Sequence, residues 1–197
     1  MKGFRRLGAR LLGDDGGYTL VELLTVLLIL GVVMGGLTTV FARATSAEAD
    51  MNNRFQAQQG ARLALDKLRR EIHCASSASP VGSNVSSITL TVPSYCRTYS
   101  GNASVTWCTR SVATNRYALY RVDGSTCTGG VKWADYLTPS STAAVCSGAL
   151  CIFNYTAQST SSLAKLHIDF PVNPAPSRTV DAYELVDDLV LRNSTRS

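Results

Sequence analysis

The longest apolar run of the chain extends from residue 18 to residue 41 and contains a single charged side chain, that of Glu22. A helix of this length would be about 36 Å long, which is enough to cross a membrane once. A carboxylate inside a bilayer costs roughly 2.5–3.5 kcal/mol or more, so an isolated one indicates a functional role. We therefore predict a membrane-spanning helix over residues 18–45.

A different helical pattern follows in residues 46–79, which contain no proline and are rich in Ala, Gln, Arg, Glu and Leu up to residue 72. These residue types favour helices. The residues that recur at spacings of four, three and four, and so share one helical face, are Ala61, Leu65, Leu68 and Ile72. We expect one helix of about 60 residues, apolar in its first half and amphipathic in its second half, which packs on a globular domain.

The hydrophobic pattern changes beyond Pro80, where apolar and polar residues begin to alternate. Alternation with period two is typical of strands that bury one face. Five strands are predicted, at residues 88–92, 117–122, 151–156, 163–170 and 183–191. The stretches 94–115 and 125–150 are rich in Ser, Thr, Gly and Cys and resemble loops fastened by disulfides. The predicted fold class is α+β: a long N-terminal helix packed on an antiparallel sheet, with residues 80–197 as the sheet domain.

Six cysteines lie in the second part of the chain, at positions 74, 96, 108, 127, 146 and 151. An even number in a Ser- and Thr-rich domain favours disulfides over metal ligands. The chain has two histidines and no C-x-x-C pair, so we predict no zinc site. Fifteen connectivities are open; we favour a bond between Cys96 and Cys108, with two more among Cys74, Cys127, Cys146 and Cys151.

Other candidate chemistry is sparse. Adjacent residues of a helix point about 100° apart, so His73 and Cys74 do not form a thiol–imidazole pair. Asp187 and Asp188 could contribute to a calcium site, but a solvated edge is the better interpretation of two acids in a strand. No nucleophile elbow, phosphate-binding loop or zinc-protease motif is present. The sequence predicts neither an enzyme nor a cofactor.

The N-terminal segment supplies the most specific pattern. A short basic stretch with Lys2, Arg5, Arg6 and Arg10 precedes Gly17, Tyr18 and Glu22. This layout resembles the class III signal of the type IV pilin superfamily. The resemblance implies that a prepilin peptidase removes residues 1–17 by cutting after Gly17 and that the new α-amino group of Tyr18 is methylated. It also implies that Glu22 pairs with the N-terminus of a neighbouring subunit during assembly.

The second half of the predicted helix and the end of the chain resemble one subclass of that superfamily. Residues 58–72 and 189–193 are similar to the corresponding parts of J-type minor pseudopilins and W-type minor pilins. The resemblance implies a structural subunit of a type IV pilus or type II secretion-like filament that initiates or caps assembly. The implied partners are the prepilin peptidase and methyltransferase, other pilin or pseudopilin subunits, the inner-membrane assembly platform, and membrane lipid before assembly.

The distribution of basic residues predicts how the chain is oriented in the membrane. The formal net charge is +5, and the basic residues before the apolar run hold the N-terminus in the cytoplasm under the positive-inside rule. We expect a single-pass cytoplasmic membrane protein with an extracytoplasmic C-terminal domain, which then enters a filament. The alternative function is a pilus-associated adhesion or DNA-uptake module. Four arginines that could bind nucleic acid are spread over loops and strands, which disfavours this partner: Arg97, Arg110, Arg116 and Arg121.

Overall fold

A computed structural model of the chain describes residues 17–175, 178 and 182–194. The basic residues of the predicted leader, Lys2, Arg5, Arg6 and Arg10, lie outside the described residues. The chain divides into two compact units, one up to Ala49 and the other from Asp50 onward.

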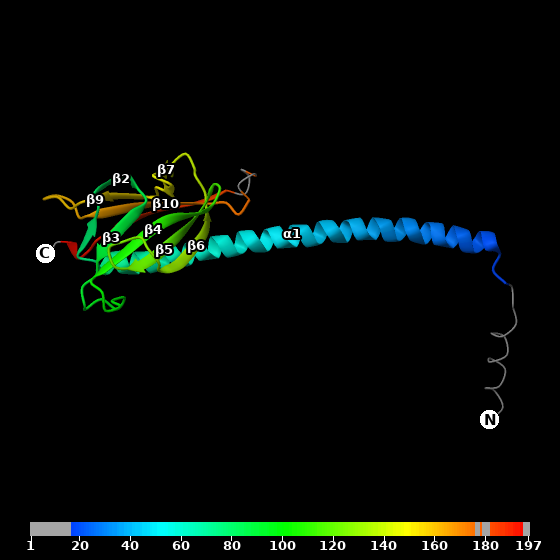
Figure 1. The fold of residues 1–197 in the computed structure, drawn as a ribbon, viewed down its shortest axis with the longest axis horizontal. Helices are drawn as coiled ribbons and strands as arrows, with labels where there is room; N and C mark the ends of the chain where they lie inside the picture. The colour runs from blue at the N-terminus through cyan, green and yellow to red at the C-terminus, as the bar shows by residue number, and fades with distance from the viewer. Residues whose placement is uncertain (1–16, 176–177, 179–181, 195–197) are drawn as a thin grey trace, which may run out of the picture. The chain divides into compact units, whose positions relative to one another are not determined.

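One helix, α1 (Leu20–Cys74), runs from the first unit into the second (Figure 1). Its apolar part is long and hydrophobic enough to cross a membrane, and the residues of its most apolar stretch are not buried. The hydroxyls of Thr25, Thr38 and Thr39 donate to backbone carbonyls three residues earlier. These bonds satisfy the polar groups inside the helix, as a lipid environment requires.

The helix ends at Cys74, five residues before the end of the segment predicted as its amphipathic half, residues 46–79. The amide of Ala75 still donates to the carbonyl of Glu71, at 2.8 Å. The carbonyl of Cys74 accepts a bond from Asn193 Nδ2 at 3.0 Å, so a side chain from the far end of the chain caps the last turn. This cap fixes where the helix stops.

The second unit is built around an antiparallel sheet with the strand order β1-β3-β4-β5-β6-β10-β9-β2, and β11 also pairs with β10 (Figure 1). A separate hairpin pairs β7 with β8. The strand bounds are β1 (Ser77–Ser79), β2 (Gly82–Val85), β3 (Ser87–Thr91), β4 (Ser104–Ala113), β5 (Arg116–Asp123), β6 (Val131–Leu137), β7 (Val145–Cys146), β8 (Ala149–Leu150), β9 (Phe153–Thr156), β10 (Lys165–Val172) and β11 (Tyr183–Val190). The α+β prediction is confirmed, and β3, β5, β9, β10 and β11 correspond to the five predicted strands.

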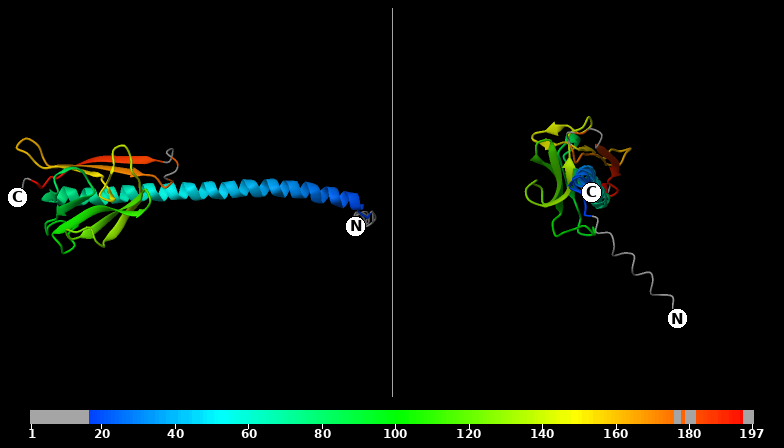
Figure 2. Two further views of the ribbon diagram at one scale, coloured as in Figure 1. Left: turned by 45° about the horizontal axis from the view of Figure 1, so that its top comes forward. Right: turned by 90° about the vertical axis from the view of Figure 1, so that its right-hand side faces the viewer.

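The sheet has two parts that meet at one corner. Strand β6 pairs with β10 through the single register pair Leu137 and Val172. Figure 2 shows β3, β4, β5 and β6 on one side of the C-terminal half of α1 and β10 and β11 on the other. The sheet thus curves around the helix, and side chains from both parts reach the same core.

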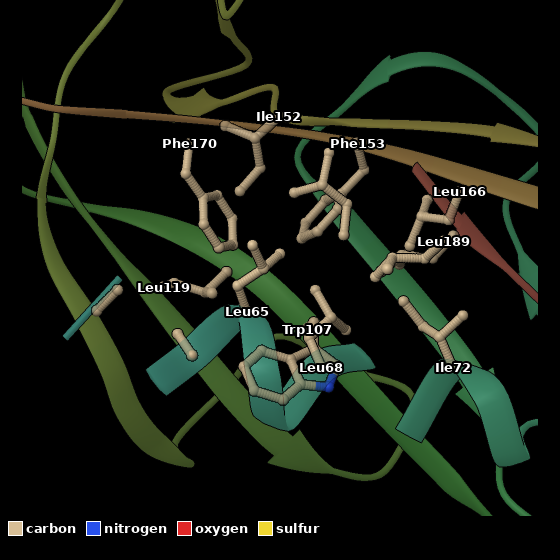
Figure 3. Packing of buried hydrophobic residues seen from close by; sticks show 14 of the residues in the cluster. Leu65, Leu68, Ile72, Trp107, Leu119, Ile152, Phe153, Leu166, Phe170 and Leu189 are labelled. Atoms are coloured by element: carbon tan, nitrogen blue, oxygen red, sulfur yellow. The ribbon is translucent and has the colours of Figure 1, made fainter. Parts of the chain in front are cut away.

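The core fills the space between the helix and the two parts of the sheet (Figure 3). Leu68 and Ile72 of α1 are fully buried, as the spacing of the apolar face predicted, and so is Trp107 of β4. Phe153 and Phe170 close the core from the opposite side. Each such aliphatic or aromatic side chain contributes about 1.5–3 kcal/mol by leaving water. The predicted packing of the amphipathic half on a sheet domain is therefore confirmed.

The interpretation of residues 94–115 and 125–150 as loops was wrong in part. The first stretch contains β4 and the second contains β6, β7 and β8. Threonines make β4 look polar, yet Thr106 and Thr109 are buried because their hydroxyls donate to the carbonyls of Gly124 and Leu150, at 2.6 and 2.5 Å. Hydroxyls satisfied in this way can lie in a core strand.

The disulfides join Cys74 with Cys96, Cys108 with Cys127, and Cys146 with Cys151. The favoured bond between Cys96 and Cys108 was wrong. Cys108 lies inside β4, whereas Cys96 lies in the connection that precedes this strand. The first bond ties the end of α1 to the β3–β4 connection, the second ties β4 to the β5–β6 connection, and the third closes the β7–β8 hairpin.

Candidate functional site

The start of α1 is closed by a reciprocal pair of side chains. The amide of Glu22 donates to Thr19 Oγ1 at 3.3 Å, and the amide of Thr19 donates to Glu22 Oε2 at 3.4 Å. The Thr19 hydroxyl donates to the same carboxylate oxygen at 3.3 Å. This is the capping box, in which an N-cap Thr and an acid three residues later satisfy each other's free amides. The sequence signature T-x-x-E marks this box, although Glu22 was predicted only as a charged pairing group.

Gly17 and Tyr18 precede the helix in irregular backbone. A β-carbon built on Gly17 would meet no atom within 4 Å, so the described part of the chain does not itself require glycine there. The side chain of Tyr18 is 79% exposed. Both residues that flank the predicted cleavage site are therefore exposed within the described part of the chain.

Glu22 is exposed, as are all described residues from 17 to 49. Its charge stands at the first turn, where the positive end of the helix dipole stabilises an acid by about 0.3–1 kcal/mol. The surrounding surface consists of exposed aliphatic side chains such as Leu20, Val21 and Leu23. The site is thus an isolated carboxylate on an apolar helix, next to a chain end that cleavage would create.

Residues 14–38 match the family described as the prokaryotic N-terminal methylation motif. This chain carries that motif. The match supports a type IV pilin-like protein that is anchored in a membrane, is processed by a prepilin peptidase and assembles with other pilin subunits. Comparison with characterised proteins and with solved structures gave no match.

The second unit has a buried polar contact that sequence reasoning missed. Glu71 of α1 is 0% exposed. Its carboxylate accepts hydrogen bonds from Trp107 Nε1 at 2.6 Å and from Arg121 Nε at 2.7 Å, and Lys67 Nζ lies 3.5 Å away. The carboxylate therefore fastens the helix to β4 and β5. The only signal in the sequence is an acid beside an apolar helical face, which is too common to identify a buried group.

The other acids considered in the sequence pair with cations. Asp187 accepts a bond from Arg69 of α1 at 2.6 Å. Asp188 contacts Lys165 Nζ and His167 Nδ1, each at 2.8 Å. Hydrogen bonds from Lys165 and His167 lower the pKa of Asp188. These contacts give both acids a structural role at the edge of the sheet.

His73 and Cys74 do not face each other as a pair. The His73 ring contacts the carbonyl of Val190 through Nδ1 at 3.1 Å, and Cys74 is bonded to Cys96. The adjacent residues therefore serve two separate structural contacts.

The four arginines considered for nucleic acid make separate contacts. Arg116 donates two bonds of 2.9 Å to Asp135, and Arg121 contacts Asp123 at 2.8 Å as well as Glu71. Arg110 lies 3.4 Å from the centre of a tyrosine ring and donates to a backbone carbonyl. Arg97 is one of the basic residues of a separate hollow of about 580 Å³ at the end of α1, which is lined by Lys67, Arg70, His73, Cys74, Arg97 and Thr98.

Proposed function

We propose that the protein is a minor pilin or pseudopilin, a structural subunit of a type IV pilus or type II secretion-like filament. The observation that carries the proposal is the single carboxylate of Glu22 on an exposed apolar helix inside a methylation motif. In this proposal a prepilin peptidase cuts after Gly17 and the new α-amino group of Tyr18 is methylated. The amine keeps its positive charge after one methylation.

Glu22 then pairs with the N-terminal amine of a neighbouring subunit. Two charges removed from water cost several kcal/mol each unless they are matched, so a subunit in the wrong register is penalised. In the free subunit the capping contact with Thr19 holds the carboxylate, which prepares it for the partner. The charge thus selects the register, whereas van der Waals contacts of the apolar helix supply adhesion.

The second unit suits a specialised position in the filament. Three disulfides close its connections, and the curved sheet encloses the end of α1. We assign to this subunit the initiation or capping of assembly, in line with the resemblance of residues 58–72 to J-type and W-type subunits. The mechanical work comes from other components of the assembly machine.

The test separates charge from capping. Glu22→Gln keeps a capping side chain, because Gln serves at this position of the box, but removes the charge. Thr19→Ala removes the cap at a cost of about 0.5–2 kcal/mol but keeps the charge. We expect Glu22→Gln to be cleaved normally and to fail in co-purification with filament subunits, and Thr19→Ala to be incorporated. Normal incorporation of Glu22→Gln would contradict the proposed role of the charge.

The alternative of a DNA-uptake module rests on the basic hollow that contains Lys67, Arg70 and Arg97. Arg70 already pairs with Asp66, and Lys67 lies near Glu71. A single hollow offers few phosphate contacts, whereas DNA-binding surfaces contact many. Binding of a 20-base-pair duplex that weakens steeply with salt and is lost in Arg97→Gln would favour this alternative over a purely structural subunit.

A further inference from the structure

The connection between β3 and β4, residues 92–103, is fastened to the end of α1. The disulfide between Cys74 and Cys96 ties it to the last residue of the helix. Two backbone bonds fix its turn: the amide of Cys96 donates to the carbonyl of Pro93 at 2.9 Å, and the amide of Tyr99 donates to the carbonyl of Cys96 at 3.0 Å. The side chains of this turn are therefore carried on a backbone that is held against the helix.

The hollow of about 580 Å³ described above is lined by this connection and by the helix, and its lining is basic. Three of its basic side chains already contact an acid or a carbonyl: Lys67, Arg70 and His73. Arg97 is exposed and has no hydrogen bond or ion pair with any described residue. Arg97 is thus the charge at this hollow that no described acid balances.

Thr98, the next residue, adds an unsatisfied polar group to the same hollow. Its Oγ1 atom is buried and has no hydrogen-bond partner among the described residues. Nearly all buried hydroxyls in folded proteins are paired, because a buried hydroxyl without a partner is destabilising. An acceptor oxygen brought into the hollow would satisfy Thr98 and the guanidinium of Arg97 together.

Two tyrosines flank these groups along the chain. The side chain of Tyr95 is 62% exposed and that of Tyr99 is 36% exposed. Tyrosine and arginine are among the residue types that contribute most to binding at protein–protein interfaces. The stretch 95–99 therefore combines side chains suited to a protein partner with an unbalanced cation.

We propose that the β3–β4 connection and the adjoining hollow bind an acidic segment of a protein partner, with one carboxylate of that segment in the hollow. The carboxylate accepts two bonds from the planar guanidinium of Arg97, the geometry that arginine–carboxylate pairs favour, and a third from Thr98 Oγ1. Tyr95 and Tyr99 supply contact area beside it. The proposal concerns the second unit alone and does not depend on the proposed role of Glu22.

The charge balance favours a carboxylate over a nucleic acid. A carboxylate carries one negative charge, which matches the single unbalanced guanidinium of Arg97. A phosphate monoester carries about 1.5–2 negative charges at pH 7, and a DNA duplex presents many phosphates, so both need more free cations. The other basic side chains of the hollow would have to leave their present partners to supply them.

The test presents the full chain, in non-ionic detergent micelles and immobilised through a C-terminal tag, to a phage-displayed library of random linear peptides. We expect the selected peptides to be enriched in acidic residues. Fluorescence anisotropy then measures the Kd of several selected peptides for the unmodified chain and its variants. Arg97→Gln should weaken binding about tenfold to a hundredfold, because hydrogen bonds to a charged group are lost.

A second variant separates binding from folding. Thr98→Val removes the hydroxyl but keeps the shape of the side chain. It should weaken binding about twofold to tenfold and leave the urea midpoint of unfolding unchanged or higher, because it removes an unsatisfied buried group. The matched control is Arg62→Gln, which removes an equal charge from an exposed position of α1 outside the hollow and should bind like the unmodified chain.

Four results would overturn the proposal. The first is a selection that yields no peptides, or peptides without acidic residues. The second is acidic peptides that bind Arg97→Gln as tightly as the unmodified chain, which would place their site elsewhere. The third is equal weakening by Arg62→Gln and Arg97→Gln, which would show general charge attraction. The fourth is a DNA duplex that binds more tightly than every selected peptide and is lost in Arg97→Gln, which would assign the hollow to nucleic acid.

Discussion

The buried carboxylate of Glu71 offers the sharpest test of how the helix is held on the sheet. Glu71→Gln keeps an oxygen that can accept the Trp107 bond but removes the charge that faces Arg121. The Arg121 side chain is 11% exposed and retains Asp123 at 2.8 Å, so it loses one of its two carboxylate partners. Breaking a buried pair costs about 3–5 kcal/mol, and the remaining partner reduces this to about 2–3 kcal/mol.

Glu71→Ala should cost more, about 3–5 kcal/mol, because the indole N–H of Trp107 also loses its acceptor. The assay is urea unfolding of the full chain in a mild non-ionic detergent, followed by the fluorescence of Trp107 and Trp133. These are the two tryptophans of the chain, and both lie in the second unit. With a slope of roughly 2 kcal/mol/M, Glu71→Gln should lower the midpoint by about 1–1.5 M.

The matched control is Asp66→Asn on the same helix. Asp66 pairs with Arg70 at the surface, where the two side chains are 48% and 69% exposed. Surface pairs contribute at most about 1 kcal/mol and commonly less than 0.5 kcal/mol. If Glu71→Gln destabilised the protein no more than Asp66→Asn does, the conclusion that the buried carboxylate fastens the helix would be refuted.

Two further predictions concern stability. Although burial opposes its ionisation, hydrogen bonds from Arg116 and Lys132 lower the pKa of Asp135 to about 2. The ionised Asp135 carboxylate contributes its full share of the free energy of unfolding above the ordinary pKa of an aspartate, and this share is lost as the pH falls from about 4 to about 2. In Asp135→Asn the free energy of unfolding should therefore depend less on pH between about 4 and 2. Replacing the Cys74–Cys96 bond by two serines should cost about 3 kcal/mol, against about 2 kcal/mol for the Cys146–Cys151 bond, because the first closes the longer loop. Equal midpoints for the two variants in urea would contradict that ordering.

Local patterns in the sequence were sufficient to predict much of the fold. The spacing of Leu65, Leu68 and Ile72 predicted the buried face of α1, and period-two alternation predicted five strands. Strand β4 was not predicted because the acceptors of its buried hydroxyls come from distant parts of the chain. The Thr109 hydroxyl, for example, donates to the carbonyl of Leu150, which lies 41 residues later. The disulfide pairing likewise depends on which strands become neighbours, and local composition does not encode this.

The candidate sites likewise include one that local sequence predicts and others that it does not. The N-terminal motif can be predicted from the sequence because its residues are close together along the chain. Thr19 and Glu22, for example, contact each other across three residues. The roles of Glu71 and Thr98 cannot be predicted from the local sequence, because they depend on burial and on neighbours from distant parts of the chain. For Glu71 the partners are 36 and 50 residues away. An acid in a helix or a strand has no local signal that distinguishes a solvated side chain from a buried one.

The central claim is that the chain is a processed, pilin-like subunit, and its most direct test is the mass of the mature protein. The full chain, carrying a C-terminal tag, would be expressed in its own host and its intact and N-terminal peptide masses measured. We predict a chain that begins at a methylated Tyr18, with residues 1–17 removed. A chain that still begins at Met1 while the host's prepilin peptidase is active would contradict the account and would leave α1 as a plain membrane anchor.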